Sequence, residues 1–205
     1  MTNHRARATP VLVGVLLVAL GVGAIFLGRH QPVGLADPRG STTSIPAAPG
    51  SIPRSEPVRL VVPSLGLRAL VEPLGLQSDG EIAVPSNTVD TGWYDEGPSP
   101  GQTGSSVIVG HVDSYRGVGV FFSLRSLLAG SLVTVLLANG DDAHFRVTSV
   151  RTYEKNAFPS QLVYGNHGYA ALNLVTCGGV FNRHTGHYES NVVVYSTFVG
   201  SSHSA

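Results

Sequence analysis

The stretch ALNLVTCGG (Ala171–Gly179) is an apolar run that ends in the only cysteine of the chain and two glycines. Short apolar runs that are bounded by turn residues are typical of buried strands. A strand that ends at a flexible loop can present its last side chain to solvent, where a nucleophile must lie. The run therefore predicts a strand with Cys177 at its end. It leaves two interpretations open, a reactive thiol or a buried structural cysteine.

A second apolar run, SVIVGH (Ser106–His111), also ends in a side chain that can do chemistry. A thiol has an ordinary pKa near about 8.5 and needs a cationic or basic neighbour to hold a useful fraction of thiolate. Histidine can supply that neighbour if the two strands lie side by side. The alternative for His111 is a structural histidine with satisfied hydrogen bonds.

The rest of the domain follows the same pattern of short β-rich runs between turn signals. Such runs at this spacing predict seven or eight strands in a barrel or a sandwich. One short helix is expected from Phe121 to Leu128, where large apolar residues fall on one face. The further predicted strands are Val58–Val62, Leu70–Glu72, Leu132–Leu137, Ala143–Tyr153 and Asn191–Phe198.

The N-terminal residues predict that the protein is exported from the cytoplasm. Residues 11–27 carry no charged side chain and follow Arg5 and Arg7, which favours a transmembrane anchor over residues 11–28 and a cytoplasmic N-terminus over residues 1–10. A cleaved signal peptide is the alternative, and both interpretations place the domain outside the cell. Residues 29–57 are rich in Pro, Ser and Gly and predict a disordered tether. The folded domain is expected over residues 58–199, with a polar tail over residues 200–205.

Composition and spacing argue against several classes of partner. The 13 Lys and Arg residues balance 13 Asp and Glu residues, and no basic stripe is present, so nucleic acid is not an expected partner. Cys177, His184 and His187 have a spacing that suits zinc poorly, and no calcium loop of the D-x-D-x-D kind occurs. We expect no metal and no cofactor.

The ordered motifs around Cys177 and His111 are similar to those of the sortase family. The variant with GHVDS and TCGG most resembles the class F sortases of actinobacteria, and the resemblance covers roughly Val58 to Phe198. The matching segments are Gly110–Ser114, Gly119–Leu124, Tyr153–Lys155, Phe158–Pro159, Val163–Gly165, Leu174–Gly179, Thr185–Tyr188 and Asn191–Tyr195.

The resemblance implies a mainly β fold, a closed sortase-like barrel of about eight strands with one or two short helices after an N-terminal transmembrane helix. It also implies a cysteine transpeptidase on the outer side of the plasma membrane, which it would cross once. Cys177 would attack the threonine carbonyl of an LPxTG-like sorting signal and form a thioacyl enzyme. An amine, such as that of a peptidoglycan precursor, would then take the acyl group, with His111 as acid and base. Thr176 would hydrogen-bond the substrate, and Asp113 would orient the loop or His111.

The third catalytic role departs from the family pattern. Sortases use an arginine on the strand after the cysteine loop, and the register of the motifs places Asn191 at that position. Arg183, in the loop after Cys177, is the nearest cation, and Arg116, in the loop after His111, is a second candidate. Asn191 can itself donate a hydrogen bond to an oxyanion or bind the substrate.

Two other functions remain open at this stage. The same site could hydrolyse the thioacyl enzyme as a cysteine peptidase of the hydrolase class when no suitable amine is present. The alternative that is not an enzyme is an exported β-barrel that binds peptides or wall components. In that protein Cys177 would be buried and inert.

Overall fold

The computed structural model describes residues 50–78 and 82–203. The predicted cytoplasmic N-terminus, the predicted anchor and most of the predicted tether lie outside these residues. Every helix within residues 50–78 and 82–203 is too short or too polar to cross a bilayer.

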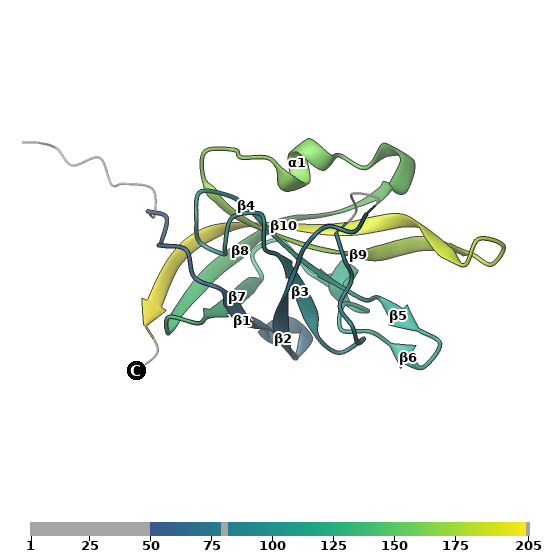
Figure 1. The fold of residues 1–205 in the computed structure, drawn as a ribbon, viewed down its shortest axis with the longest axis horizontal. Coiled ribbons are helices and arrows are strands. Elements are labelled where there is room, and N and C mark those ends of the chain that lie inside the picture. The colour runs from purple at the N-terminus through teal and green to yellow at the C-terminus, as the bar shows by residue number, and fades with distance from the viewer. Residues whose placement is uncertain (1–49, 79–81, 204–205) are drawn as a thin grey trace, which may run out of the picture. The chain divides into compact units, whose positions relative to one another are not determined.

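Eight of the strands in the described region close into a barrel (Figure 1). In hydrogen-bonded order they are β1 (Pro57–Val62), β2 (Leu67–Leu74), β3 (Thr91–Tyr94), β4 (Gly104–Gly110), β9 (Ala170–Asn182), β10 (His187–His203), β8 (Asp141–Glu154) and β7 (Leu132–Leu137), which returns to β1. The expected closed barrel of about eight strands is confirmed. Two short strands, β5 (Asp113–Ser114) and β6 (Gly117–Val118), form a separate hairpin after β4.

Alternating apolar side chains fill the interior of the barrel. On β7, for example, Val133, Val135 and Leu137 are buried while the residues between them are more exposed. Because strand side chains alternate between the two faces of a sheet, this period directs one set of residues inward. Phe145 on β8 meets Phe198 on β10 edge to face, with 5.6 Å between ring centroids. The barrel therefore has a packed core and no lumen.

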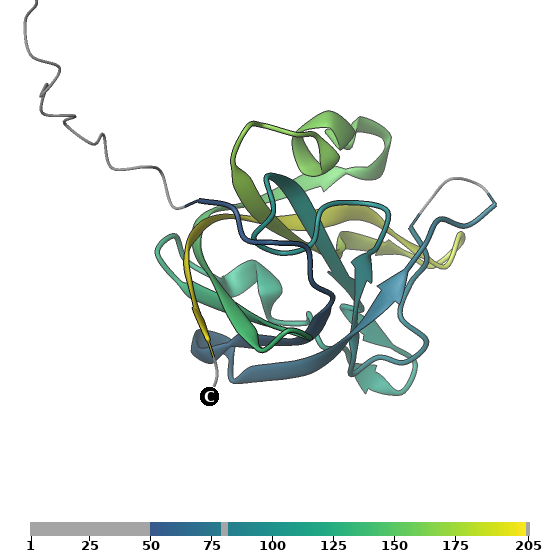
Figure 2. The same cartoon turned by 60° about the vertical axis from the view of Figure 1, so that its left-hand side comes forward.

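A second apolar cluster covers part of the barrel's outer surface. Val107, Val175 and Val193 of β4, β9 and β10 pack there against Val163 of α1 (Ser160–Tyr164). The segment that carries α1 and the 3₁₀ helix η3 (Lys155–Ala157) links β8 to β9 and lies over this outer face (Figures 1 and 2). The same face holds the side chain of Cys177, two residues beyond Val175, so this segment borders the candidate site.

The strand carrying Cys177 is longer than the sequence predicts. We expected the strand to end at Cys177 and a loop to follow, but β9 runs on to Asn182 and pairs with β10 as a long hairpin. The register shifts between Tyr188 and Ser190, where Gly179 and Val180 of β9 stand opposite the single residue Glu189 of β10 and form a β-bulge. Gly179 has φ +76°, a conformation that glycine accepts easily, so the pairing bends here without ending.

The predicted helix at 121–128 was also wrong in kind. The chain forms only a 3₁₀ helix there, η2 (Leu124–Ser126). Phe121, Leu124 and Leu127 are buried, and their spacing of three suits the 3.0-residue turn of a 3₁₀ helix as well as it suits an α-helix. A further 3₁₀ turn, η1 (Pro63–Leu65), joins β1 to β2.

Both predicted domain boundaries fall inside ordered structure. The backbone N–H of Ile52 donates to Gly101 O over 3.0 Å, and Arg54 lies over the Trp93 ring with 4.9 Å to its centroid. At the other end, β10 continues to His203 because residues 200–203 pair with β8. The polar composition that predicted a tether and a tail does not prevent backbone pairing at a sheet edge.

Candidate active site

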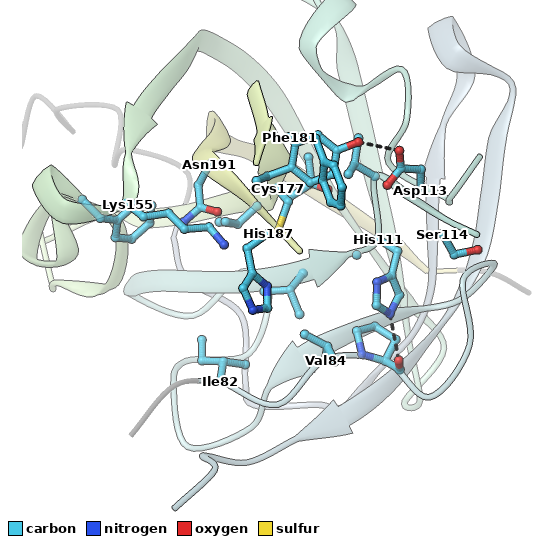
Figure 3. A pocket seen from close by; sticks show the side chains of 18 of the residues that line it. Ile82, Val84, His111, Asp113, Ser114, Lys155, Cys177, Phe181, His187 and Asn191 are labelled. Atoms are coloured by element: carbon cyan, nitrogen blue, oxygen red, sulfur yellow. Dashed lines mark hydrogen bonds between the residues drawn. The ribbon is translucent and has the colours of Figure 1, made fainter. Parts of the chain in front are cut away.

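Cys177 lies on β9, and His111 comes directly after β4, the parallel neighbour of β9. The last registered pair between β4 and β9 is Val109 with Val175, and His111 and Cys177 each come two residues further along. Because parallel strands run in step, the two side chains reach the same level at the same edge of the sheet. Both are partly exposed, and both line one cavity of ≈ 1260 Å³ (Figure 3). The expectation that the two strands lie side by side is confirmed.

A hydrogen bond to the backbone holds the imidazole of His111. Its Nε2 lies 3.0 Å from the carbonyl oxygen of Pro85 in the connection between β2 and β3 (Figure 3). A carbonyl only accepts hydrogen bonds, so Nε2 carries the proton and donates it. In the neutral ring this leaves Nδ1 free to accept a proton. The contact therefore fixes both the ring orientation and the tautomer.

A second hydrogen bond joins the segment after His111 to the start of β10. The Tyr188 hydroxyl donates to Asp113 Oδ2 over 2.5 Å. This bond is the main cause of a raised pKa of Tyr188, followed by burial, by the charge of Asp113 and by the negative charge that a Cys177 thiolate carries. Tyr188 and Cys177 line the same cavity. Through Tyr188, Asp113 joins the segment after His111 to β10.

The cavity has an apolar region and a polar region. Aromatic rings from two segments, β3 and the connection between β8 and β9, meet in the apolar region: Phe158 lies 6.1 Å from Tyr164 and Tyr94 lies 6.5 Å from Tyr164, measured between centroids. Leu76, Ile82 and Val84 of the β2–β3 connection line the cavity as well, with Val84 beside His111 in Figure 3. The polar lining residues are His111, Asp113, Ser114, Lys155, His187, Tyr188 and Asn191. The volume exceeds the roughly 1,000 Å³ of large small-molecule pockets and suits a peptide segment.

Of the three candidates for the third catalytic role, Asn191 alone lines the cavity within the described residues. It pairs directly with Cys177 across β9 and β10. Arg183 is exposed in the turn between these strands, outside the cavity lining. Arg116 is exposed in the turn between β5 and β6, and its guanidinium lies 5.1 Å from the centroid of the Tyr115 ring. The structure does not bring either arginine to the cavity.

Sequence reasoning missed Lys155 as a site residue. It is the only Lys or Arg among the described residues that line the cavity. The signal was present, because Lys155 is the single lysine of the chain and falls in the segment Tyr153–Lys155 that resembles the family. A lone lysine at the end of a strand is usually a solvated charge, so its position became informative only with the fold.

Thr176 does not present its hydroxyl to the cavity. Strand alternation directs its side chain to the opposite face of β9 from Cys177, toward the barrel interior. Thr176 counts among the lining residues, yet its Oγ1 is shielded from solvent and has no hydrogen-bond partner among the described residues. Of the two histidines considered for a metal site, His187 lines the cavity and His184 does not.

The fold and this site together are those of a β-barrel cysteine transpeptidase. Among protein families, the sortase domain matches residues 60–199, so the chain belongs to the sortase family. No curated protein sequence matches the chain.

Solved sortase structures share the fold at low sequence identity. Sortase A from Listeria monocytogenes has a TM-score of 0.57 and 14% identity over 74% of this chain and 92% of its own. The SrtA sortase from Actinomyces oris has a TM-score of 0.55 and 19% identity over 77% of this chain and 89% of its own. Sortase C from Clostridium perfringens SM101 has a TM-score of 0.52 and 14% identity over 69% of this chain and 68% of its own.

Proposed function

We propose that this protein is a membrane-anchored class F sortase, which cleaves an LPxTG-like signal on exported proteins and transfers them to an amine of the cell wall precursor. The observation that carries the proposal is the register of β4 and β9, which brings His111 and Cys177 to the same edge of one peptide-sized cavity. The uncharged run over residues 11–27, after two arginines, supports an anchor with the catalytic domain outside the membrane. The motifs GHVDS and TCGG support class F.

The two residues divide the chemistry between them. In the first step the Cys177 sulfur forms a bond to the threonine carbonyl carbon of the signal. The bond from that carbon to the glycine nitrogen breaks, and the imidazolium of His111 gives its proton to the leaving amine. In the second step the neutral imidazole takes a proton from the incoming amine, whose nitrogen displaces the sulfur. Its Nδ1 is suited to this exchange because Nε2 is held by Pro85.

The apolar region of the cavity suits the leucine and proline of such a signal. The Phe158, Tyr164 and Tyr94 rings offer faces and edges for aliphatic side chains, and polar side chains such as Asn191 line the cavity as well. Burial of an apolar side chain in such a region contributes about 1.5–3 kcal/mol. The peptide would therefore lie with its apolar residues among the rings and its threonine carbonyl at the sulfur.

Mass spectrometry of the full chain in detergent, with an LPxTG peptide and an excess of a glycine-type amine, tests the proposal. We expect cleavage between threonine and glycine, a thioacyl adduct on Cys177, and the transferred product. Without the amine, slow hydrolysis should replace transfer. Cys177→Ala should abolish all three products, and activity retained by that variant would disprove the mechanism. A native thiol that resists a mild alkylating agent would favour the non-catalytic binding protein instead.

A further inference from the structure

The chemistry described so far assigns no cation to the negative charge that acyl transfer creates. When the sulfur attacks a carbonyl, the carbonyl oxygen gains charge, and donors aimed at that oxygen lower the barrier. Neither Arg183 nor Arg116 lines the cavity. Lys155 does, and within the described residues no carboxylate forms an ion pair with it. Lys155 is therefore the one Lys or Arg side chain that the described lining offers to a substrate.

Strand order places Lys155 on a definite side of the nucleophile. Cys177 lies on β9, between β4 with His111 on one side and β10 with Asn191 on the other. Asn191 pairs with Cys177 on one edge and with Tyr153 of β8 on the other, and Lys155 follows Tyr153 by two residues. In Figure 3 the Lys155 side chain is directed toward Asn191, across the cavity from His111.

The leaving nitrogen and the carbonyl oxygen of the peptide point in different directions during the reaction. The leaving nitrogen must face the proton donor, so it points toward His111 and β4. The carbonyl carbon is tetrahedral after attack, so its oxygen lies in a different direction from the leaving nitrogen. On the opposite side stand the Asn191 amide and, beyond it, the flexible four-carbon stem and compact charge of lysine. An oxygen directed to that side faces the part of the cavity that Asn191 and Lys155 line.

We propose that Lys155 is a catalytic residue that stabilises the oxyanion of the thioacyl transition state, with the Asn191 amide as its neutral partner. This inference rests on the proposed transpeptidase function. Sortases use an arginine at the position where this chain has Asn191. In this inference Lys155 takes the role of that arginine. The ammonium keeps its protons throughout, and its contribution is electrostatic.

The backbone at Lys155 is anchored on both sides. The Tyr195 hydroxyl donates to the Tyr153 hydroxyl over 3.3 Å, and the Tyr153 ring meets Phe158 edge to face with 6.3 Å between centroids. Both aromatic residues pack on the outer cluster of the barrel. The stem of Lys155 thus starts from a fixed point, as a catalytic group requires.

Single-turnover acylation of the full chain in detergent tests this role. Lys155→Met keeps most of the stem and removes the charge, and we expect the acylation rate to fall by about 10²–10³-fold. Lys155→Arg restores a cation and should recover at least a tenth of the rate. Arg68→Met, which removes an exposed cation on β2 outside the cavity lining, should acylate like the wild type.

Alkylation by iodoacetamide separates oxyanion stabilisation from other effects. This reaction displaces iodide and charges no carbonyl oxygen, so Lys155→Met should alkylate within twofold of the wild-type rate. If Lys155→Met acylates within threefold of wild type, or if only KM rises, the inference is wrong. It is also wrong if Arg183→Ala shows the large loss instead. A wild-type protein that forms no thioacyl adduct would refute the proposed function itself.

Discussion

Replacement of Thr176 by valine should stabilise the protein without slowing acyl transfer. Thr176 is 5% exposed, and its Oγ1 is shielded and has no partner among the described residues. A buried hydroxyl without a hydrogen bond costs about 1–3 kcal/mol. Valine replaces that hydroxyl by a methyl group of similar size, so it relieves the cost and leaves no cavity. For a domain of this length the melting temperature should rise by about 2–10 °C.

The catalytic rate should not follow the stability. The Thr176 side chain lies on the opposite face of β9 from Cys177, so the hydroxyl does not meet a peptide bound at the sulfur. We expect kcat/KM for an LPxTG peptide to stay within threefold of the wild-type value. Thermal denaturation followed by circular dichroism and steady-state kinetics measure the two effects on the same preparation.

Ser106 offers a matched control. Its hydroxyl is also buried and without a partner, but Ser106 does not line the cavity in the described structure. Ser106→Ala should gain less stability because alanine leaves a small void, with activity unchanged. A lower melting temperature for Thr176→Val would show that the hydroxyl has a partner. A loss of more than tenfold in kcat/KM would show that it serves the substrate, as the sequence resemblance implies.

Three further changes have defined outcomes. Tyr188→Phe removes the hydrogen bond to Asp113 and should cost about 1 kcal/mol near neutral pH in urea denaturation. Because that bond raises the pKa of Tyr188, its contribution is complete below the ordinary value of about 10 and is lost as pH rises through the raised value, so wild type and variant should converge in strong alkali. Gly179→Ala places Cβ 2.6 Å from a serine hydroxyl of β10 at φ +76° and should cost at least about 1–2 kcal/mol, more than Gly168→Ala, which has φ +80° but open space; equal losses would contradict the clash. Phe158→Ala should raise KM about tenfold with kcat retained, since the ring lines the apolar region of the cavity, and an unchanged KM would place the peptide elsewhere.

Much of the barrel could be predicted from local pattern. Leu132–Leu137, for example, is a short β-rich run between turn residues, and it forms a strand as expected. β3 was missed because its four residues, Thr91 to Tyr94, include a glycine and are too few to show a period. The helix α1 has five residues, which is also below the length at which helical periodicity appears. Strand order depends on long-range pairing, which no local pattern encodes.

The residues of the candidate site could also be predicted only in part. Cys177 and His111 stood out because each follows an apolar run, and the structure puts their strands side by side. Lys155 did not stand out, because it reaches the cavity from a third segment through the pairing of β8 with β10. We missed the orientation of Thr176 because we took Cys177 as the last residue of its strand. In the structure β9 continues to Asn182, so Thr176 and Cys177 point to opposite faces.

The parallel pairing of β4 with β9 also sets the order in which reactivity appears during folding. His111 and Cys177 are 66 residues apart in the sequence, and contacts of such separation form late because a long loop must close first. The imidazole and the groups on β10 and η3 reach the thiol only when the barrel closes. The site is therefore assembled by the completed fold, and no short segment of the chain contains it.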